Sequence, residues 1–276
     1  KGLSLYIHRA FFVVNDPIAM GVDTTWIINL DRRPDRISRM SEMSPSMVEK
    51  AIRFPALDGR KLSLTPDLVK MFSGSTGINW SRGVVACALS HISLWMKMIE
   101  DRNDIQSYLI LEDDAVLQPE AIPLLNYINE RGLMPDDCDV LYLGGILPPN
   151  KEGFATVIEP VNECIGRVKE NTLFSSTQSR YFHFCAYSYI LRRSGAKKLC
   201  DRLAREGCWA PADHLLCNSH SDLNIYFTTP LVAGCYQDSD PRYTESNFNT
   251  FGKEDYDSDL RNDEKFSQEE IGASSS

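Results

Sequence analysis

A run of apolar, β-forming residues that stops at consecutive carboxylates is the feature that most constrains the fold of this chain. Tyr108–Leu117 reads YLILEDDAVL, so four such residues lead into Glu112, Asp113 and Asp114 before apolar residues resume. A short apolar run with an abrupt polar stop is typical of a buried strand that ends at a surface. The pattern therefore predicts an acidic edge at the end of a core strand.

The three acids have two interpretations. Adjacent carboxylates repel one another unless a cation lies among them, and their oxygens suit Mg²⁺, Ca²⁺ or Mn²⁺. Because ligands of open α/β sheets bind beyond the carboxyl ends of the strands, the segment favours a divalent metal that holds a phosphate-bearing ligand. In the other interpretation the strand enters a solvated turn, and Asp113 or Asp114 caps the next helix. The segment alone leaves both open.

Strand-like and helix-like segments alternate along the chain. Apolar residues at helical spacing predict helices after Pro34, over 83–100, around 122–128 and over 195–205. Residues 60–82 and 148–180 are expected to be irregular. The alternation predicts an α/β fold with a mostly parallel sheet flanked by helices. The strand-like runs are 24–30, 52–57, 108–111, 140–143, 182–191 and 225–228.

The length of 276 residues predicts one large domain, or one domain with extensions. We predict an N-terminal extension over 1–21, the domain over 22–248 and an acidic tail over 249–276, which has few large apolar residues and is predicted to be disordered. The net charge of −9 argues against a nucleic-acid partner. No stretch approaches the roughly 20 apolar residues of a membrane span, so no transmembrane segment is expected in this chain.

The eight cysteines do not form a recognisable metal or redox motif. None of them form a Cys-x-x-Cys pair, which argues against a zinc ribbon or a thioredoxin-like site. Cys87, Cys185 and Cys200 lie in apolar runs and are interpreted as small core residues. The triplet Asn79-Trp80-Ser81 would accept an N-glycan in a secretory lumen, so the compartment stays open.

A series of short motifs, in a fixed order, carries a family resemblance. The chain contains IINLDRRPDR, FPALDG, GVVACALSHISLW, LILEDDAVL, YLGG, AYSYILRRSGAKKL, PADHLL and QDSD, over roughly residues 24–240. This order resembles glycosyltransferase family 25, which includes bacterial lipooligosaccharide galactosyltransferases and procollagen galactosyltransferases. Each motif alone is weak, whereas the ordered series is specific. The resemblance implies a GT-A type fold, a nucleotide-sugar donor, a divalent metal and inversion at the anomeric carbon.

The resemblance assigns the metal to the acidic strand end. A departing nucleoside diphosphate gains negative charge, which a bridging Mn²⁺ or Mg²⁺ stabilises. Asp113 and Asp114 match the family's acidic motif and are the expected metal and ribose contacts. Alternation along the strand puts Glu112 and Asp114 on one face. Glu112 therefore competes with Asp113 to be the second residue, beside Asp114, that makes these contacts. Asp238 or Asp240 is expected to add a metal ligand, and we assign this role to Asp240. In the alternative, both residues belong to an exposed acidic turn.

The donor is expected to meet the segment after the first strand. Asn29 and the backbone that includes Leu30 are predicted to contact the uracil or ribose of a UDP-sugar. Arg33 and Arg36, with Arg32 as a third candidate, are expected to face phosphate through forked donors. In the alternative, these arginines pair with neighbouring aspartates on a solvated helix end, and we expect at least one of the three to do so.

Three further residues are candidates for the donor pocket. Asp58 follows the second predicted strand and is expected to accept the uracil N–H, unless it only forms an Asp-Gly turn. Ser90 and His91 lie on an apolar helix, and the family pattern also carries Ser-His. A histidine on such a helix is more often a core residue, so both roles stay open.

Asp213 is the expected catalytic base. An inverting transfer needs a base that removes the acceptor hydroxyl proton as that oxygen attacks from the face opposite the leaving group. Enzymes of the resembled fold usually place that acid at a helix start, and PADHLL is typical of a loop that enters a helix. The alternative is that Asp213 only caps the helix. His214 is the weaker candidate for a base.

The resemblance therefore predicts a metal-dependent hexosyltransferase. Galactose or glucose would pass from a UDP-sugar to a glycan or a hydroxylated protein, in lipopolysaccharide biosynthesis or protein glycosylation. Acceptor contacts are expected from residues 145–180. Localisation would be cytoplasmic and membrane-peripheral for a bacterial-like protein, and the ER or Golgi lumen for one like the procollagen transferases. The alternatives are a nucleotide-sugar hydrolase and a catalytically weak binding protein with the same fold.

Overall fold

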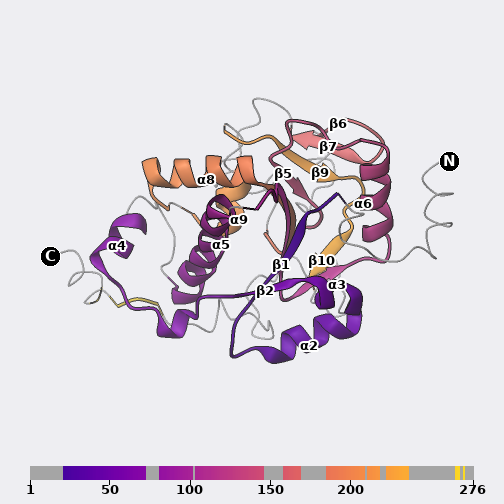
Figure 1. The fold of residues 1–276 in the computed structure, drawn as a ribbon. Coiled ribbons are helices and arrows are strands. Elements are labelled where there is room, and N and C mark those ends of the chain that lie inside the picture. Colours follow the sequence, from indigo (N-terminus) through magenta and orange to yellow (C-terminus); the bar gives the residue numbers. More distant parts are fainter. Residues whose placement is uncertain are drawn as a thin grey trace, which may run out of the picture.

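An eight-stranded sheet forms the centre of the protein (Figure 1). Across it the strands lie in the order β2-β1-β3-β8-β5-β9-β7-β6. The computed structural model describes residues 21–72, 81–101, 103–145, 158–168, 185–208, 210–217, 222–235, 265–267 and 270. The strands of this sheet are β1 (Thr24–Asn29), β2 (Ile52–Pro55), β3 (Ser107–Glu112), β5 (Val140–Tyr142), β6 (Ile158–Pro160), β7 (Ile165–Val168), β8 (Ser188–Arg192) and β9 (Ile225–Thr228).

Six of these eight strands run in one direction. β1 pairs in parallel with β2 and β3, and β5 pairs in parallel with β9. Only β7 and β8 run in the opposite direction. β3 and β5, which lie on either side of β8, therefore point the same way. The predicted α/β class, with a mostly parallel sheet flanked by helices, is confirmed.

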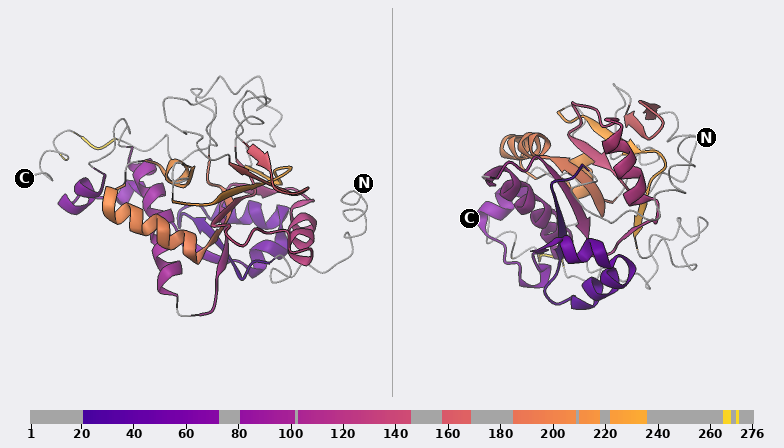
Figure 2. Two further views of the ribbon diagram at one scale, coloured as in Figure 1. Left: turned by 90° about the horizontal axis from the view of Figure 1, so that it is seen from above. Right: turned by 45° about the vertical axis from the view of Figure 1, so that its right-hand side comes forward.

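Helices cover both faces of the sheet (Figures 1 and 2). Alternate side chains of a strand point to opposite faces. Trp26 and Ile28 therefore join the core that includes Trp95 of α5 and Leu199 of α8, whereas Ile27 joins the core formed with α2, α3 and α6. The helices are α2 (Pro34–Met43), α3 (Pro45–Lys50), η3 (Gly59–Lys61), α4 (Pro66–Phe72), α5 (Arg82–Glu100), α6 (Ala121–Glu130), α8 (Arg193–Glu206) and α9 (Ala212–Cys217).

Local sequence explains how several elements begin and end. Pro34 and Pro45 open α2 and α3, where a missing backbone N–H leaves no intrahelical bond unmade. The Asp58 side chain caps η3 by accepting a hydrogen bond from the Arg60 N–H. Gly144, just after β5, lies against the backbone of Ala233, where a Cβ would come within 2.4 Å of the carbonyl oxygen.

The segments expected to be irregular contain regular structure. Residues 60–82 include part of η3 and all of α4, and residues 148–180 include β6 and β7. A separate two-stranded sheet pairs β4 (Ala115–Leu117), directly after the acids, with β10 (Ala233–Cys235). These strands have only three or four residues, too few for a periodic pattern, and depend on partners far away in the sequence. β8 begins at Ser188, later than the strand predicted from residue 182.

Part of the predicted disordered tail is folded against α5. Phe266 is buried, and the guanidinium of Arg82, at the start of α5, lies 4.4 Å from the centre of its ring. Glu270 pairs with Arg82 and accepts a hydrogen bond from the Ser267 N–H, while the Glu270 N–H donates to Ser267 Oγ. The prediction of disorder is therefore wrong for these residues. The rest of the tail and residues 1–20 of the predicted extension lie outside the described residues.

Within the described residues, the structure contains neither a helix that could cross a membrane nor a disulfide bond. No helix in the described part of the chain has both the length and the apolar character needed to cross a bilayer. The seven cysteines whose side chains are described are all free thiols. The sequon residue Asn79 lies outside the described residues.

Candidate active site

A cavity of about 340 Å³ lies beyond the carboxyl ends of β1 and β3, against the wall formed by α5. The end of β3 supplies its acids, α5 supplies Cys87, Ser90 and His91, and the first turn of α9 supplies Asp213. Segments far apart in the sequence thus meet at the edge of the sheet where ligands of α/β proteins bind. The polar and titratable residues that line the cavity are Arg32, Arg36, Cys87, Ser90, His91, Glu112, Asp113, Asp114, Cys185, Tyr187, Asp213, His214 and Cys235.

Asp113 is held by two neighbours. Arg36 Nη1 lies 2.8 Å from Asp113 Oδ1, and Asn29 Nδ2 donates to Asp113 Oδ2 at 2.7 Å. Burial raises the pKa of Asp113 despite the opposing effect of Arg36. Burial would lower the pKa of Arg36, but the charge of Asp113, the hydrogen bond to it and the charge of Asp114 together outweigh burial, so the pKa of Arg36 is raised. Arg36 and Asp113 are therefore a fixed, charged pair at the base of the cavity.

Asp114 has an oxygen without a partner. Its Oδ1 is buried and makes no hydrogen bond within the described residues. Burial, followed by the charges of Glu112 and Asp113, raises the pKa of Asp114 to about 7. A buried acceptor with no donor is costly, and a bound cation removes that cost. Asp114 thus presents a buried carboxylate oxygen whose surroundings favour a nearby cation.

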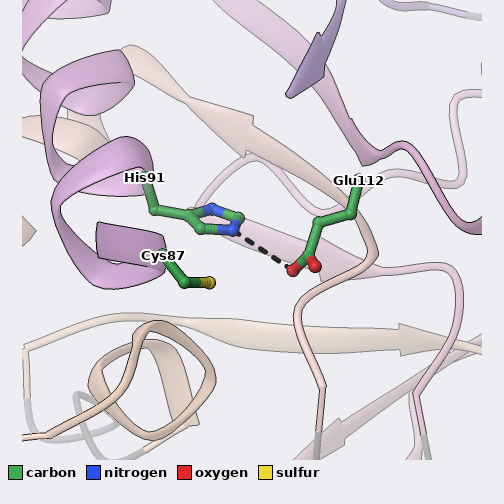
Figure 3. A group of neighbouring side chains, drawn as sticks. All are labelled: Cys87, His91 and Glu112. Atoms are coloured by element: carbon green, nitrogen blue, oxygen red, sulfur yellow. Dashed lines mark hydrogen bonds and ion pairs between the residues drawn. The ribbon is translucent and has the colours of Figure 1, made fainter. Parts of the chain in front are cut away.

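Glu112 lies at the end of a hydrogen-bond chain that starts in the core; Figure 3 shows its last link, between His91 and Glu112. Trp95 Nε1–H, which can only donate, donates to Tyr189 Oη at 3.0 Å. Tyr189 Oη lies 2.8 Å from His91 Nδ1, and His91 Nε2 lies 3.2 Å from Glu112 Oε1. If Tyr189 donates to Nδ1, the Nε2–H donates to Glu112. His91 is therefore both a satisfied core residue and a cavity residue that orients a carboxylate.

Asp213 lies within the first turn of α9, which begins at Ala212. The Cys185 N–H donates to Asp213 Oδ2 at 3.0 Å, and the His214 N–H donates to Oδ1 at 2.9 Å. Cys185 has a φ of 73°, a left-handed conformation that costs energy for a residue other than glycine. The backbone thus fixes the Asp213 carboxylate at the cavity wall, and the residue does not occupy the helix-capping position itself.

The three arginines after β1 have different partners. Arg33 pairs with Asp35 at 2.8 Å, as the alternative interpretation expected for at least one of them, and this pairing lowers the pKa of Asp35 to about 2. Arg36 pairs with Asp113 as described, and Arg32 lies 3.2 Å from Asp58. Arg32 and Arg36 line the cavity, as does Leu30, whereas Arg33 does not.

The other donor-pocket candidates make local contacts. Asp58 caps η3 and pairs with Arg32, and it lies outside the cavity lining, although Leu57 and Gly59 line the cavity. Ser90 Oγ accepts from the Leu57 N–H at 2.9 Å and donates to the Ala86 carbonyl at 2.7 Å. Asp238 and Asp240 lie outside the described residues. The described cavity thus gathers most of the predicted donor residues, but Asn29, Arg33 and Asp58 do not line it.

Several residues with clear positions at the site were not identified from the sequence. Arg53 Nε donates to Asn29 Oδ1 at 2.8 Å and so holds the side chain that supports Asp113. Cys87 was interpreted as a core residue, yet it lines the cavity one helical turn before His91. The spacing of four residues places both on one helix face, a signal that was present in the sequence. No sequence pattern indicated that Cys185 would have a left-handed backbone or that the Tyr189 hydroxyl would contact His91.

The family assignment follows from sequence comparison. The model of "Glycosyltransferase family 25 (LPS biosynthesis protein)" matches residues 22–216, which include every described acid of the cavity. The chain belongs to glycosyltransferase family 25. The resemblance identified from its motifs is confirmed.

Relatives with assigned names support the same family. A Glycosyltransferase 25 family member of Drosophila melanogaster is 31% identical over 136 residues, which cover 45% of this chain and 21% of the relative. Procollagen galactosyltransferase 2 of Homo sapiens is 28% identical over 142 residues, which cover 46% of this chain and 21% of the relative. An Inactive glycosyltransferase 25 family member 3 of Mus musculus is 30% identical over 136 residues, 45% of this chain and 22% of the relative. The matched region thus spans about a fifth of the length of these curated relatives.

A solved structure with a similar arrangement is the apo form of mouse xyloside xylosyltransferase 1. The similarity covers 74% of this chain and 83% of that chain, with 11% sequence identity and a TM-score of 0.36. This score is too low to add to the family assignment.

Proposed function

We propose that this protein is a metal-dependent, inverting glycosyltransferase that moves a hexose from a UDP-sugar to a hydroxyl group of a glycan or a hydroxylated protein. The observation that carries the proposal is the buried, unpartnered Oδ1 of Asp114, in a cavity that Asp213 also lines. Family membership supports glycosyl transfer in general. Galactose or glucose as the sugar rests on the names of relatives, such as human procollagen galactosyltransferase 2.

The acidic edge fits Mn²⁺ or Mg²⁺. Asp114 offers an oxygen that has no hydrogen-bond donor, and Asp113 keeps lone pairs beyond those used by Arg36 and Asn29. Carboxylate oxygens are the ligands these ions prefer. When bound, the ion supplies charge stabilisation to the departing diphosphate. We assign Asp113 and Asp114 as ligands, and we propose Asp240 as a further ligand from outside the described residues.

The donor would occupy the part of the cavity between β1 and α5. Leu30, Arg36, Ser90 and His91 line this part, and Asn29 supports it through Asp113. Since Arg36 is already paired with Asp113, its main contribution is to hold that carboxylate in place. We assign Arg33 and Asp58 supporting roles behind the lining.

Asp213 would accept the proton of the acceptor hydroxyl. In an inverting displacement the new bond forms on the face of the sugar opposite the leaving diphosphate, while the hydroxyl proton passes to a nearby base. Asp213 reaches the cavity from α9, a different element from β3, which carries the metal-binding acids. Its backbone donors, from Cys185 and His214, leave each oxygen a further lone pair for the acceptor.

A second candidate function has support among the relatives. The mouse protein that is 30% identical over 136 residues is named an inactive family member. A protein of this kind could bind a nucleotide-sugar without transferring the sugar. A slow hydrolysis of the donor is a related possibility. Both differ from transfer in the product, because neither adds a sugar to an acceptor.

The direct test is a donor screen read by product mass. The protein is incubated with Mn²⁺, with UDP-galactose or UDP-glucose, and with either a hydroxylysine-containing peptide or an oligosaccharide acceptor. We expect one acceptor to gain the mass of one hexose, and we expect Asp114→Asn to abolish this gain. Free hexose without acceptor product would identify a hydrolase. No product in any combination would favour the binding protein.

A further inference from the structure

The wall of the cavity carries a second group of potential metal ligands, separate from the Asp113–Asp114 pair. Cys87, His91 and Glu112 each offer one ligand atom, and these atoms all lie within 4.8 Å of one another. Figure 3 shows the three side chains pointing toward a common space, two from α5 and one from the end of β3. Sulfur, imidazole nitrogen and carboxylate oxygen together form a ligand set that suits Zn²⁺.

The spacing of two of these atoms already matches a tetrahedral zinc site. Zn–N and Zn–O bonds of roughly 2.0–2.2 Å at a tetrahedral angle place the two ligand atoms about 3.3 Å apart. His91 Nε2 and Glu112 Oε1 lie 3.2 Å apart. The Cys87 sulfur lies within 4.8 Å of the other two atoms. Since a Zn–S bond of about 2.3 Å requires a separation near 3.6 Å, the sulfur needs to move closer by at most about 1 Å. Rotation about its χ1 angle can supply such a movement because Cys87 is only half-buried.

The surroundings of His91 also fit a metal-bound imidazole. A metal-ligating histidine usually donates its other ring N–H to a fixed partner, which sets the tautomer. Tyr189 Oη lies 2.8 Å from His91 Nδ1 and occupies this position. A hydroxyl oxygen has two lone pairs, so Tyr189 can accept from Nδ1–H as well as from Trp95. The change of tautomer frees Nε2 for a metal.

The local charge favours a cation at this wall. Glu112, Asp213 and Asp114 line the same cavity as Cys87 and make the potential there negative. The same negative potential attracts a divalent ion, and ion binding replaces the thiol proton.

We propose that Cys87, His91 and Glu112 form a binding site for a thiophilic divalent ion of the Zn²⁺ class, distinct from the carboxylate site at Asp113 and Asp114. The site does not depend on the proposed transferase activity. It lies within the cavity, so an ion there would neutralise Glu112 and take His91 out of its hydrogen bond with that carboxylate.

Co²⁺, which occupies zinc sites and absorbs light, is the probe. We expect the wild-type protein, titrated with Co²⁺ alone, to develop a near-ultraviolet thiolate-to-cobalt absorption band, and Zn²⁺ to remove this band. Cys87→Ala should abolish the band. Cys200→Ala, a half-buried cysteine on α8, is the matched control and should retain it. Asp114→Asn should also retain it, which separates this proposal from the transferase proposal.

A second variant guards against a trivial loss of folding. Tyr189→Phe removes only the hydroxyl that supports His91, and we expect Co²⁺ affinity to fall by about 10- to 100-fold. Thermal unfolding of each variant checks that the fold is intact. The proposal is overturned if wild-type protein shows no thiolate band, if the band persists in folded Cys87→Ala, or if it is lost in Cys200→Ala.

Discussion

Arg36 of α2 and Asp113 at the end of β3 form an ion pair at 2.8 Å with both side chains almost fully buried. The pair joins a helix on one face of the sheet to the acidic edge of the cavity. Breaking a buried pair leaves an uncompensated charge, which is strongly destabilising, whereas exposed pairs contribute little. This difference gives a test with an internal control.

We expect Arg36→Met to lower the free energy of unfolding by about 3–5 kcal/mol, because Asp113 is left buried without its counter-charge. Arg33→Met removes a neighbouring arginine whose partner, Asp35, is half exposed, and it should cost about 0–1 kcal/mol. Urea unfolding of both variants measures the difference. If the Arg36→Met/Asp113→Asn double variant is no more stable than Arg36→Met, the pair is not the cause.

Asp114 should make stability depend on pH. Its pKa is about 7 in the folded protein against 3.8 as the ordinary value, so the folded state binds more protons than the unfolded chain between these two values. Stability should therefore fall as pH rises from about 4 to 7, and Asp114→Asn should remove this part of the slope. Melting temperatures across this range, wild type against variant, measure it.

Mn²⁺ should reverse that effect. The ion binds the ionised carboxylate, so it should raise the wild-type melting temperature more at pH 7.5 than at pH 5.5. Asp114→Asn should show little response to Mn²⁺ at either pH. Equal stabilisation of the two proteins would place the metal elsewhere.

Asp213→Asn should separate chemistry from binding. The amide keeps the size of the side chain but takes up a proton poorly, so kcat should fall by about 10²- to 10⁴-fold while UDP affinity stays near that of wild type. Asp201→Asn, on the exposed pair with Lys197, is a control that should not change kcat. A parallel loss of UDP affinity in Asp213→Asn would indicate a structural role.

The folded C-terminal residues should stabilise the start of α5. Phe266→Ala removes a buried ring and its contact with Arg82, and it should lower the free energy of unfolding by about 3 kcal/mol. Lys265→Ala, at an exposed neighbouring position, should have little effect. Hydrogen exchange should report faster exchange at the first turns of α5 in Phe266→Ala. Unchanged exchange there would mean that the tail does not support this helix.

The sequence predicted the elements that have strong local patterns. β3 is a six-residue strand with four fully buried residues, and α5 repeats apolar residues over 19 residues, so both were visible from periodicity. β4 and β10 were not visible, because each has three residues and is stabilised by the other across more than a hundred residues. Phe266 was missed because the charges around it dominate the composition of the tail.

The candidate site shows the same division. The acids after β3 and Asp213 stand out by residue type and by family resemblance. The residues that hold the site in place do not stand out in the sequence, because they come from distant segments. Tyr189 lies 98 residues from His91, and Asn29 lies 84 residues from Asp113. The pairing of Arg32 with Asp58, and of Arg36 with Asp113, depends on how β1, β2 and β3 lie side by side. Such choices between nearby arginines require the three-dimensional fold.

The most direct measurement of the central claim is a calorimetric titration with UDP, with and without Mn²⁺, of the wild type and of Asp114→Asn. If Asp114 holds a metal that binds the diphosphate, wild-type protein should bind UDP with clearly higher affinity when Mn²⁺ is present, and Asp114→Asn should lose that gain. Equal UDP affinity with and without Mn²⁺ in the wild type, or the same gain in both proteins, would contradict the account.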